Sequence, residues 1–310
     1  MGVYIVKRLM LTVPLLLVIS FLTFVLINLS PQDPAKLVLQ AQDVPVITDE
    51  LIDQTKKELG LDDPFIVQYM NWLISCLKLD FGNSYVKDES VWVLLGPAFF
   101  NTLKLTFVSS IVIIASSIIL GVVCALTEDR VLDRFIRGLF FFLSALPAYL
   151  IAILIIWYFS VELDLLPTSG LESYQSYILP VLVIALTHIG LYFRTVRSSM
   201  LANLNEDYVL YARASGLPEK KIIVAILKNS LQVSISIFCM SIPLILGGTV
   251  VIENVFAWPG LGSLSVKSIL SKDFPVIQAY VLIIAVAFVV LNTTSDIINT
   301  ALNPKLRVGE

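Results

Sequence analysis

Residues 105–126 read LTFVSSIVIIASSIILGVVCAL, a run of 22 residues without a single charge. About 20 apolar residues in a helix cross the roughly 30 Å hydrocarbon core of a bilayer, because each residue adds about 1.5 Å. Backbone polar groups in lipid must bond within their own segment, so such runs are expected to be helical, and the alternation of a membrane barrel is absent. Five further runs predict five more membrane helices, at 9–29, 138–161, 178–193, 231–252 and 276 to about 302.

The composition of the whole chain supports a membrane protein. Hydrophobic residues make up 57% of the 310 residues, the mean hydropathy is +0.87, and 15% of residues are charged, whereas soluble domains keep about 25% charged. The expected fold class is therefore an all-α integral membrane protein with six transmembrane helices. The three cysteines lie far apart and offer neither a disulfide framework nor the spacing of metal ligands.

Basic residues set the orientation of the six helices, since they gather on the cytoplasmic side of a membrane. With the N-terminus inside, the inner segments hold 13 of the 21 lysines and arginines, including every arginine, and the outer segments hold eight lysines. Both termini are therefore predicted to be cytoplasmic. The run 9–29 resembles a secretion signal, but it is long enough to span and no small-residue cleavage site follows it, so we expect a retained first helix.

Three regions follow from this topology. Residues 1–29 form the N-terminal region and first helix, residues 30–104 an outer segment with short amphipathic helices, and residues 105–310 a five-helix core that includes a cytoplasmic loop at 198–228. In the outer segment, two acids at 49–50 predict the start of a helix that ends at Gly60, and the Asp-Pro pair at 63–64 predicts the start of a second.

The cytoplasmic loop contains a charged stretch that can form a helix, NEDYVLYARASGLPEKK at 205–221. Asn205 can cap a helix whose first turn is acidic. Gly216 can end that helix, and Pro218 can begin the next. A short helix with small side chains and a sharp glycine turn fits a groove on a soluble partner, although a plain solvated hairpin accounts for these residues equally well.

Residues 208–217, YVLYARASGL, resemble the cytoplasmic coupling motif of permeases of ATP-binding-cassette (ABC) importers. The general motif is Glu-Ala-Ala, three residues and Gly. Leu210 and Tyr211 stand in place of the Glu and the first Ala, while Ala212 and Gly216 match. The Ala-Arg-Ala-x-Gly form is similar to the dipeptide/oligopeptide/nickel branch, first-subunit type. Other stretches resemble the same branch: FGNS at 81–84, LPTSG at 166–170, ILP at 178–180 and, most specifically, FAWPGLG at 256–262.

The resemblance implies an energy-coupled importer with the type I permease fold. It implies a pore shared with a second homologous permease subunit as a heterodimer, two cytoplasmic ABC ATPases, an extracellular solute-binding protein, and a location in the plasma (inner) membrane of a bacterium. It implies no catalytic residue, cofactor, metal centre or nucleic-acid partner for this chain. The residues implied to couple to the ATPase are Tyr211, Ala212, Arg213, Ala214, Ser215, Gly216 and Leu217, and those of the outer loop motif are Trp258, Pro259 and Gly260.

The chain contains no Gly-Lys dipeptide and therefore no phosphate-binding P-loop, so P-loop ATP hydrolysis is expected in another subunit. Four polar residues in or near the predicted spans are candidates for the transport path: His188, Glu253, Asn292 and Asp296. Ionisable side chains in membrane spans are functional candidates by default. His188, the only histidine, also fits a neutral side chain bonded between helices, and Asp296 fits either an ion pair with an arginine at the inner boundary or a position in the pore.

Two other classes of function stay open on the residues alone. A secondary transporter normally shows paired repeats and broken helices at matching positions, and no internal repeat is visible. An intramembrane serine enzyme would pair His188 with a serine in the membrane; a metalloprotease is excluded by the single histidine.

Three features of the sequence bear on the cargo of such an importer. The acidic outer face and His188 favour a cationic or metal-bearing solute, and the Asn-Thr-Leu-Lys stretch at 101–104 resembles metal-chelate permeases. These features favour a nickel or metallophore-type chelate, with a dipeptide or oligopeptide as the alternative.

Overall fold

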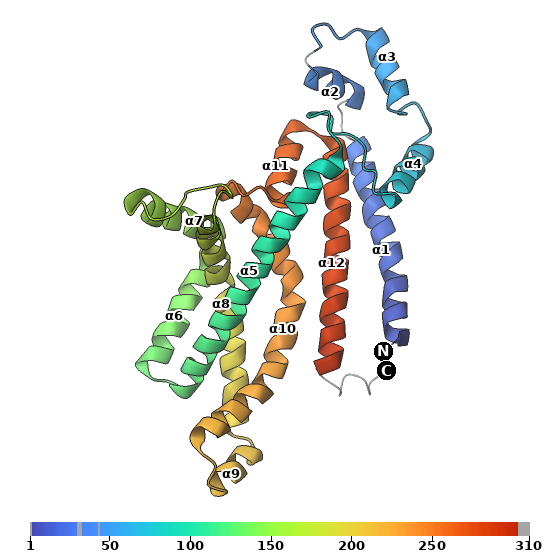
Figure 1. The fold of residues 1–310 in the computed structure, drawn as a ribbon. Coiled ribbons are helices and arrows are strands. Elements are labelled where there is room, and N and C mark those ends of the chain that lie inside the picture. The colour runs from blue at the N-terminus through green and yellow to red at the C-terminus, as the bar shows by residue number, and fades with distance from the viewer. Residues whose placement is uncertain (1, 30–32, 43, 303–310) are drawn as a thin grey trace. The chain divides into compact units, whose positions relative to one another are not determined.

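The computed structural model describes residues 2–29, 33–42 and 44–302, and these residues form helices joined by loops (Figure 1). Over the described residues there is no strand beyond one isolated antiparallel bridge between Asn83 and Ser90. The expected all-α class is thus confirmed. The helices are α1 (Gly2–Asn28), α2 (Pro34–Ala41), α3 (Asp49–Glu58), α4 (Phe65–Leu77), α5 (Val91–Leu126), α6 (Val131–Ala145), α7 (Ala148–Ile156), α8 (Ile178–Leu204), α9 (Asp207–Ala214), α10 (Glu219–Val255), α11 (Leu261–Ser271) and α12 (Phe274–Leu302), with a π-helical segment (Trp157–Glu162) after α7 and a 3-10 turn (Tyr174–Tyr177) before α8.

Four of the described helices are long and apolar enough to cross a membrane: α5, α8 together with the turn before it (Tyr174–Leu204), α10 and α12. The pair α6 and α7 gives a fifth span if the two are counted together. Within α1, residues Thr12–Leu26 form a shorter apolar helix. The predicted first run lies on a helix, while the count of six spans stays a prediction.

The helices run further than the hydropathy of the sequence indicated. α5 begins at Val91 instead of residue 105, α8 continues to Leu204 instead of residue 193, and α10 begins at Glu219 instead of residue 231. A lysine or arginine interrupts an apolar run without interrupting a helix, because long basic side chains are good helix formers. α10, with 37 residues, is about 55 Å long and exceeds the roughly 30 Å of hydrocarbon, so its ends extend beyond the bilayer.

The predicted run 138–161 is not one continuous helix. α6 ends at Ala145, α7 starts at Ala148, and the pair is bent by 104°. Pro147 has no N–H to continue the ladder, and Leu146 before it is extended, with φ −84° and ψ 139°. The single span expected from the sequence is therefore a broken pair of helices, with the break at this proline.

The chain divides into two compact units, one of Met1–Thr102 with Pro259–Val290, the other of Leu103–Trp258 with Leu291–Glu310. α8 is the centre of the second unit, where it packs against α6, α7 and α10. Two glycines allow close approach. A Cβ added at Gly121 of α5 would lie 2.6 Å from Val196, and one at Gly190 would lie 2.5 Å from the Ser144 hydroxyl of α6. α5 and α6 therefore pack on α8 with no room for a methyl group.

In the first unit, the short helices of the outer segment form as predicted, with one shift. α3 starts after Thr48, whose hydroxyl accepts the Leu51 N–H at 3.3 Å, and Gly60 at φ +66° follows its end. α4 is capped by Pro64 and starts one residue later than expected. Phe24 of α1 packs on the rings of α4, for example 5.7 Å from that of Trp72.

Candidate functional site

The charged loop folds as α9, a short helix between α8 and α10 at one end of that pair (Figure 1). Asp207 lies in its first turn and Arg213 in its last, so both charges interact favourably with the helix dipole. The N-cap position belongs to Glu206, whose side chain makes no cap bond. Asn205, the predicted cap, ends α8 instead and donates its side-chain amide to Leu201 O at 3.3 Å. The predicted helix is present, and its start is shifted by one residue.

Gly216 ends α9 in the manner predicted. Its φ of +74° is left-handed, which glycine adopts without the strain of a side chain. The Leu217 N–H donates to Ala212 O at 3.2 Å and the Gly216 N–H donates to Arg213 O at 3.0 Å. These two bonds form a Schellman motif. Arg213 also pairs with Glu219 across the turn at 3.0 Å, an exposed contact that adds little stability.

The two sides of α9 have different surroundings. Val209 is 1% exposed and packs with Met200 of α8 and Ile222 of α10, with Ala212 against the same cluster. The adjacent side chains turn away: Leu210 is 70% exposed and Tyr211 77% exposed. One side holds α9 against the end of α8 and the start of α10, and the other presents an aliphatic and an aromatic side chain to solvent.

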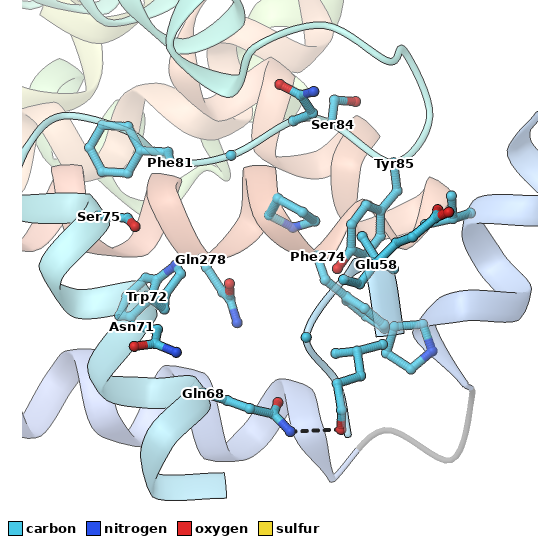
Figure 2. A pocket seen from close by; sticks show the side chains of 18 of the residues that line it. Glu58, Gln68, Asn71, Trp72, Ser75, Phe81, Ser84, Tyr85, Phe274 and Gln278 are labelled. Atoms are coloured by element: carbon cyan, nitrogen blue, oxygen red, sulfur yellow. Dashed lines mark hydrogen bonds between the residues drawn. The ribbon is translucent and has the colours of Figure 1, made fainter. Parts of the chain in front are cut away.

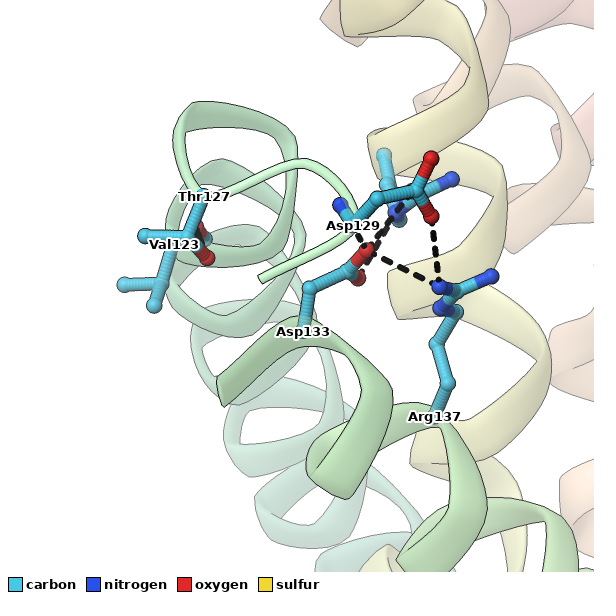
Figure 3. Close-up of polar contacts among 6 residues, drawn as sticks. Val123, Thr127, Asp129, Asp133 and Arg137 are labelled. Carbon is cyan, nitrogen blue, oxygen red and sulfur yellow. Dashed lines mark hydrogen bonds and ion pairs between the residues drawn. The ribbon is translucent and has the colours of Figure 1, made fainter. Parts of the chain in front are cut away.

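A buried ion pair lies near this anchor, in the second unit (Figure 3). Asp133, with 0% exposure, lies in the first turn of α6 and binds Arg197 of α8 through both oxygens, at 2.9 and 2.8 Å. It also contacts Arg137 at 3.2 Å and accepts the Asp129 N–H at 3.0 Å. Arg137 in turn donates to Asp129 at 3.0 Å. Two-pronged arginine–carboxylate bonds fix orientation as well as distance, so α6 and α8 are held in one register here.

Sequence reasoning counted Arg137 and Arg197 as inner-face charges and did not find this pair, which we call the α6–α8 clamp (Asp129, Asp133, Arg137 and Arg197). The residue next to the clamp on α8 is Val196, which contacts both the α9 cluster and the region of Gly121. The clamp and the cluster under α9 therefore use neighbouring positions of the same helix, α8.

The outer loop motif begins in the second unit with Trp258, beside another signature stretch. Trp258 has 0% exposure and its ring meets that of Tyr177 edge-on, with centroids 4.6 Å apart. The backbone N–H of Trp258 donates to Glu253 O at 2.8 Å, and Phe256 O accepts the Gly170 N–H at 2.9 Å. Two signature stretches, LPTSG and FAWPGLG, thus meet in space, and Glu253 lies with them as a fully buried residue.

The next residues of the motif belong to the first unit. Pro259 O accepts the side-chain amide of Asn101 at 2.9 Å, and the Thr102 hydroxyl accepts the Leu261 N–H at 2.8 Å. Because Gly260 is the N-cap of α11, the Thr102 hydroxyl satisfies one of the N–H groups that begin this helix. The Asn-Thr pair at 101–102 therefore serves to hold the start of α11.

The other candidate residues lie on separate helices. The His188 ring is half-buried on α8, and its Nδ1 lies 2.9 Å from Ile184 O. Since a carbonyl only accepts, this bond assigns the proton of a neutral ring to Nδ1 and the lone pair to Nε2. Asn292 is exposed and Asp296 half-buried, one turn apart on α12. The hydrogen bonds of His188 go to Thr187 and Ile184 of its own helix. The bond to a neighbouring helix that the sequence suggested is not observed among the described residues.

Comparison with known proteins gives a consistent result. Residues 117–308 match the family of binding-protein-dependent transport system inner membrane components, and residues 1–106 match the N-terminal model of the same membrane components. The metal-staphylopine import system permease protein CntB of Staphylococcus aureus is 55% identical over 99% of this chain and 98% of its own. The glutathione transport system permease protein GsiC of Salmonella typhimurium is 35% identical, covering 98% of both chains.

A solved structure supports the fold. An inward-facing form of the MetNI methionine ABC transporter matches with a TM-score of 0.58 and 17% identity, over 68% of this chain and 96% of that one.

Proposed function

The chain belongs to the family of binding-protein-dependent transport system inner membrane components, and from that premise we propose that it is the permease subunit of an ABC importer for metal chelates. The observation that carries the proposal is the two-sided α9. Its Val209 side packs against the end of α8 and the start of α10, while Leu210 and Tyr211 are exposed. Exposed apolar and aromatic side chains on a rigid helix are typical anchors of a protein interface.

The ATPase partner docks on the exposed side of α9. The helix and its Schellman turn, residues 211–217, enter a groove of the ATPase, and the closed turn at Gly216 leaves no side chain in the way. ATPase closure then displaces α9 together with the ends of α8 and α10 to which Val209 is packed. Displacement of packed helices as a body is one of the established forms of switching between two access states.

The full assembly contains further chains. We include a second, homologous permease that completes the pore, two ATPases and an extracellular binding protein, because a chain without a P-loop needs another subunit for ATP hydrolysis. This chain itself is a non-catalytic subunit. Its place is the inner membrane of a bacterium, as for its relatives.

The proposed cargo is a metal chelate of the staphylopine type. The support is the 55% identity to CntB over nearly the whole of both chains, against 35% to the glutathione permease GsiC. Import of a small peptide is the alternative that the second relative supports. A metal chelate carries a metal that an imidazole can bind.

Three of the polar candidates are assigned to the transport path. The unprotonated Nε2 of His188 is the atom suited to meet a chelated metal in transit. Asn292, exposed on α12, and Asp296 one turn further are assigned to the same path. Glu253 is fully buried beside Trp258, so we assign it to holding the outer end of α10 instead of contacting cargo.

Uptake separates the two cargoes. Cells that carry the importer, with and without this chain, are supplied with a labelled nickel– or cobalt–staphylopine complex and, in parallel, with labelled glutathione and a labelled dipeptide. We expect loss of the chain to abolish accumulation of the chelate and to leave peptide accumulation unchanged. Loss of peptide uptake with intact chelate uptake would refute the cargo, and no loss of either would refute the transport role.

A further inference from the structure

A cavity of about 560 Å³ lies within the first unit (Figure 2). Its walls come from α1, α2, α3, α4, the loop before α5 and the start of α12. The volume falls in the range of roughly 300–1,000 Å³ that small-molecule sites occupy. Most of its wall belongs to the segment 30–104, which the distribution of charge places outside the membrane.

The cavity is lined by charges of one sign. Among the described residues, four carboxylates contribute to its wall, Glu58, Asp63, Asp80 and Asp88, and no lysine, arginine or histidine does. Lys56, on the helix that carries Glu58, is paired instead with Asp33 at 2.8 Å, and this bond raises the pKa of the lysine. Four carboxylates around a cavity concentrate cations and repel anions.

The cation that fits is organic, and not a metal ion. Across the described residues, no group of three or more His, Cys, Asp and Glu side chains is placed to hold a metal. Aromatic rings stand among the carboxylates: Trp72 and Tyr85 are labelled in Figure 2, with Phe81 and Phe274. Ring faces attract ammonium groups but leave the hydration of a divalent metal uncompensated.

The walls are also supplied with hydrogen-bonding groups. The amide nitrogen of Gln68 donates to Leu61 O and Asp63 O, at 2.9 and 2.8 Å, which fixes the turn between α3 and α4. The amide of Gln278, from α12, adds a further polar group to the wall (Figure 2).

The aromatic wall is held in place before any ligand arrives. The Ser84 hydroxyl donates to one oxygen of Asp273 at 2.5 Å, and the Tyr85 N–H donates to the other at 3.0 Å. Ser84 and Asp273 are both buried. Burial and the charge of Asp273 raise the pKa of Tyr85 to about 12, so its ring stays neutral at physiological pH. A preorganised wall loses little conformational entropy when a ligand binds.

We propose that this cavity binds a small organic ammonium ion. The ammonium group lies against Trp72 and Tyr85 within reach of the carboxylates. None of the residues assigned to the transport path lines this cavity, and the proposal does not depend on the identity of the imported cargo.

Choline and 3,3-dimethyl-1-butanol test the charge requirement, since the second replaces the quaternary nitrogen of the first by carbon and keeps the hydroxyl. The full chain, assembled with its partner subunits in lipid nanodiscs, is titrated with each probe by calorimetry. We expect saturable binding of choline and at least roughly tenfold weaker binding of the neutral probe. Equal binding of the two, or no saturable binding of choline, would overturn the proposal.

Paired variants test the location. Glu58→Gln with Asp88→Asn removes two wall carboxylates, and Asp53→Asn with Asp62→Asn removes two exposed carboxylates of the same segment that do not line the cavity. All four positions are exposed, so each variant is expected to assemble like the wild type. We expect choline binding to weaken roughly tenfold in the first variant only. An equal loss in both would show that the general charge of the segment, not the cavity, attracts the ion.

Discussion

The α6–α8 clamp offers the sharpest test of how this chain holds its shape. Asp133 is fully buried and accepts four hydrogen bonds or ion contacts, two of them from Arg197. Arg197→Met leaves that carboxylate buried without its main partner. Removing one member of a buried pair costs about 3–5 kcal/mol. The lower end applies here, because Arg137 still reaches Asp133 and is itself partly solvated, with 37% of its side chain exposed.

The double variant reverses most of that loss. Asp133→Leu together with Arg197→Met removes both charges, and apolar replacement of a buried pair is often neutral. We therefore expect the single Arg197→Met variant to be the least stable and the double variant to be within about 1 kcal/mol of the wild type. The interaction energy between the two positions then has the size of most of the single loss.

The assay is thermal unfolding of the purified chain in detergent, followed by tryptophan fluorescence. The wild type, the single variants Arg197→Met and Asp133→Leu, and the double variant are measured side by side. A loss of about 3 kcal/mol corresponds to a fall of roughly 6–12 °C in the midpoint for a domain of this size. Raising the salt concentration is expected to change the difference little, because the pair is buried. If the double variant loses as much as the two single variants summed, the buried pair is not coupled and the reasoning fails.

Three further outcomes follow from particular residues. Gly216→Trp is expected to leave membrane insertion intact and to uncouple cargo uptake from ATP hydrolysis, since the ring enters the docking turn and φ there is +74°; normal coupling in an uptake and ATPase assay contradicts the docking site. Gly121→Ala is expected to lower the unfolding midpoint, because its Cβ would lie 2.6 Å from Val196, whereas Gly248→Ala, with nothing within 4 Å, serves as the matched control. His188→Ala is expected to reduce chelate uptake several-fold while leaving ATPase assembly unchanged, and unchanged uptake returns the residue to a packing role.

The parts of the structure that the sequence predicted depend on local signals. Hydropathy runs predict helices because each span must bury its own backbone, and α9 was predicted because its acidic start and its stop at Gly216 lie within ten residues of each other. The errors of extent are also local in origin. A hydropathy run ends at a charge, whereas a helix continues through a lysine, so α10 starts earlier than its apolar run.

The parts that could not be predicted join residues far apart in the chain. Asp133 and Arg197 are 64 positions apart, Ser84 and Asp273 are 189 apart, and Thr102 lies 159 positions from Leu261. Nothing in the spacing of one sequence pairs such residues. The pairings depend on how α6 packs on α8, how α5 meets the start of α11, and how the loop before α5 meets the loop before α12. Only an acid placed among inner-face arginines hinted at the clamp. The resemblance marked 166–170 and 256–262 as signature stretches, but the bond from the Gly170 N–H to Phe256 O follows from the fold.

The contacts of α8 decide how movement at α9 can reach the membrane core. Val209 of α9 packs on Met200 of α8, so α9 cannot shift alone without opening a cavity in that cluster. Four residues earlier on α8, Val196 meets Gly121 with no space for a methyl group, and Arg197 is held by Asp133. A displacement of α9 is therefore passed to α5 and α6 through α8, or it breaks a tight contact. It follows that variants of the clamp and of Gly121 should weaken coupling in the same direction, although neither residue lies on the exposed side of α9.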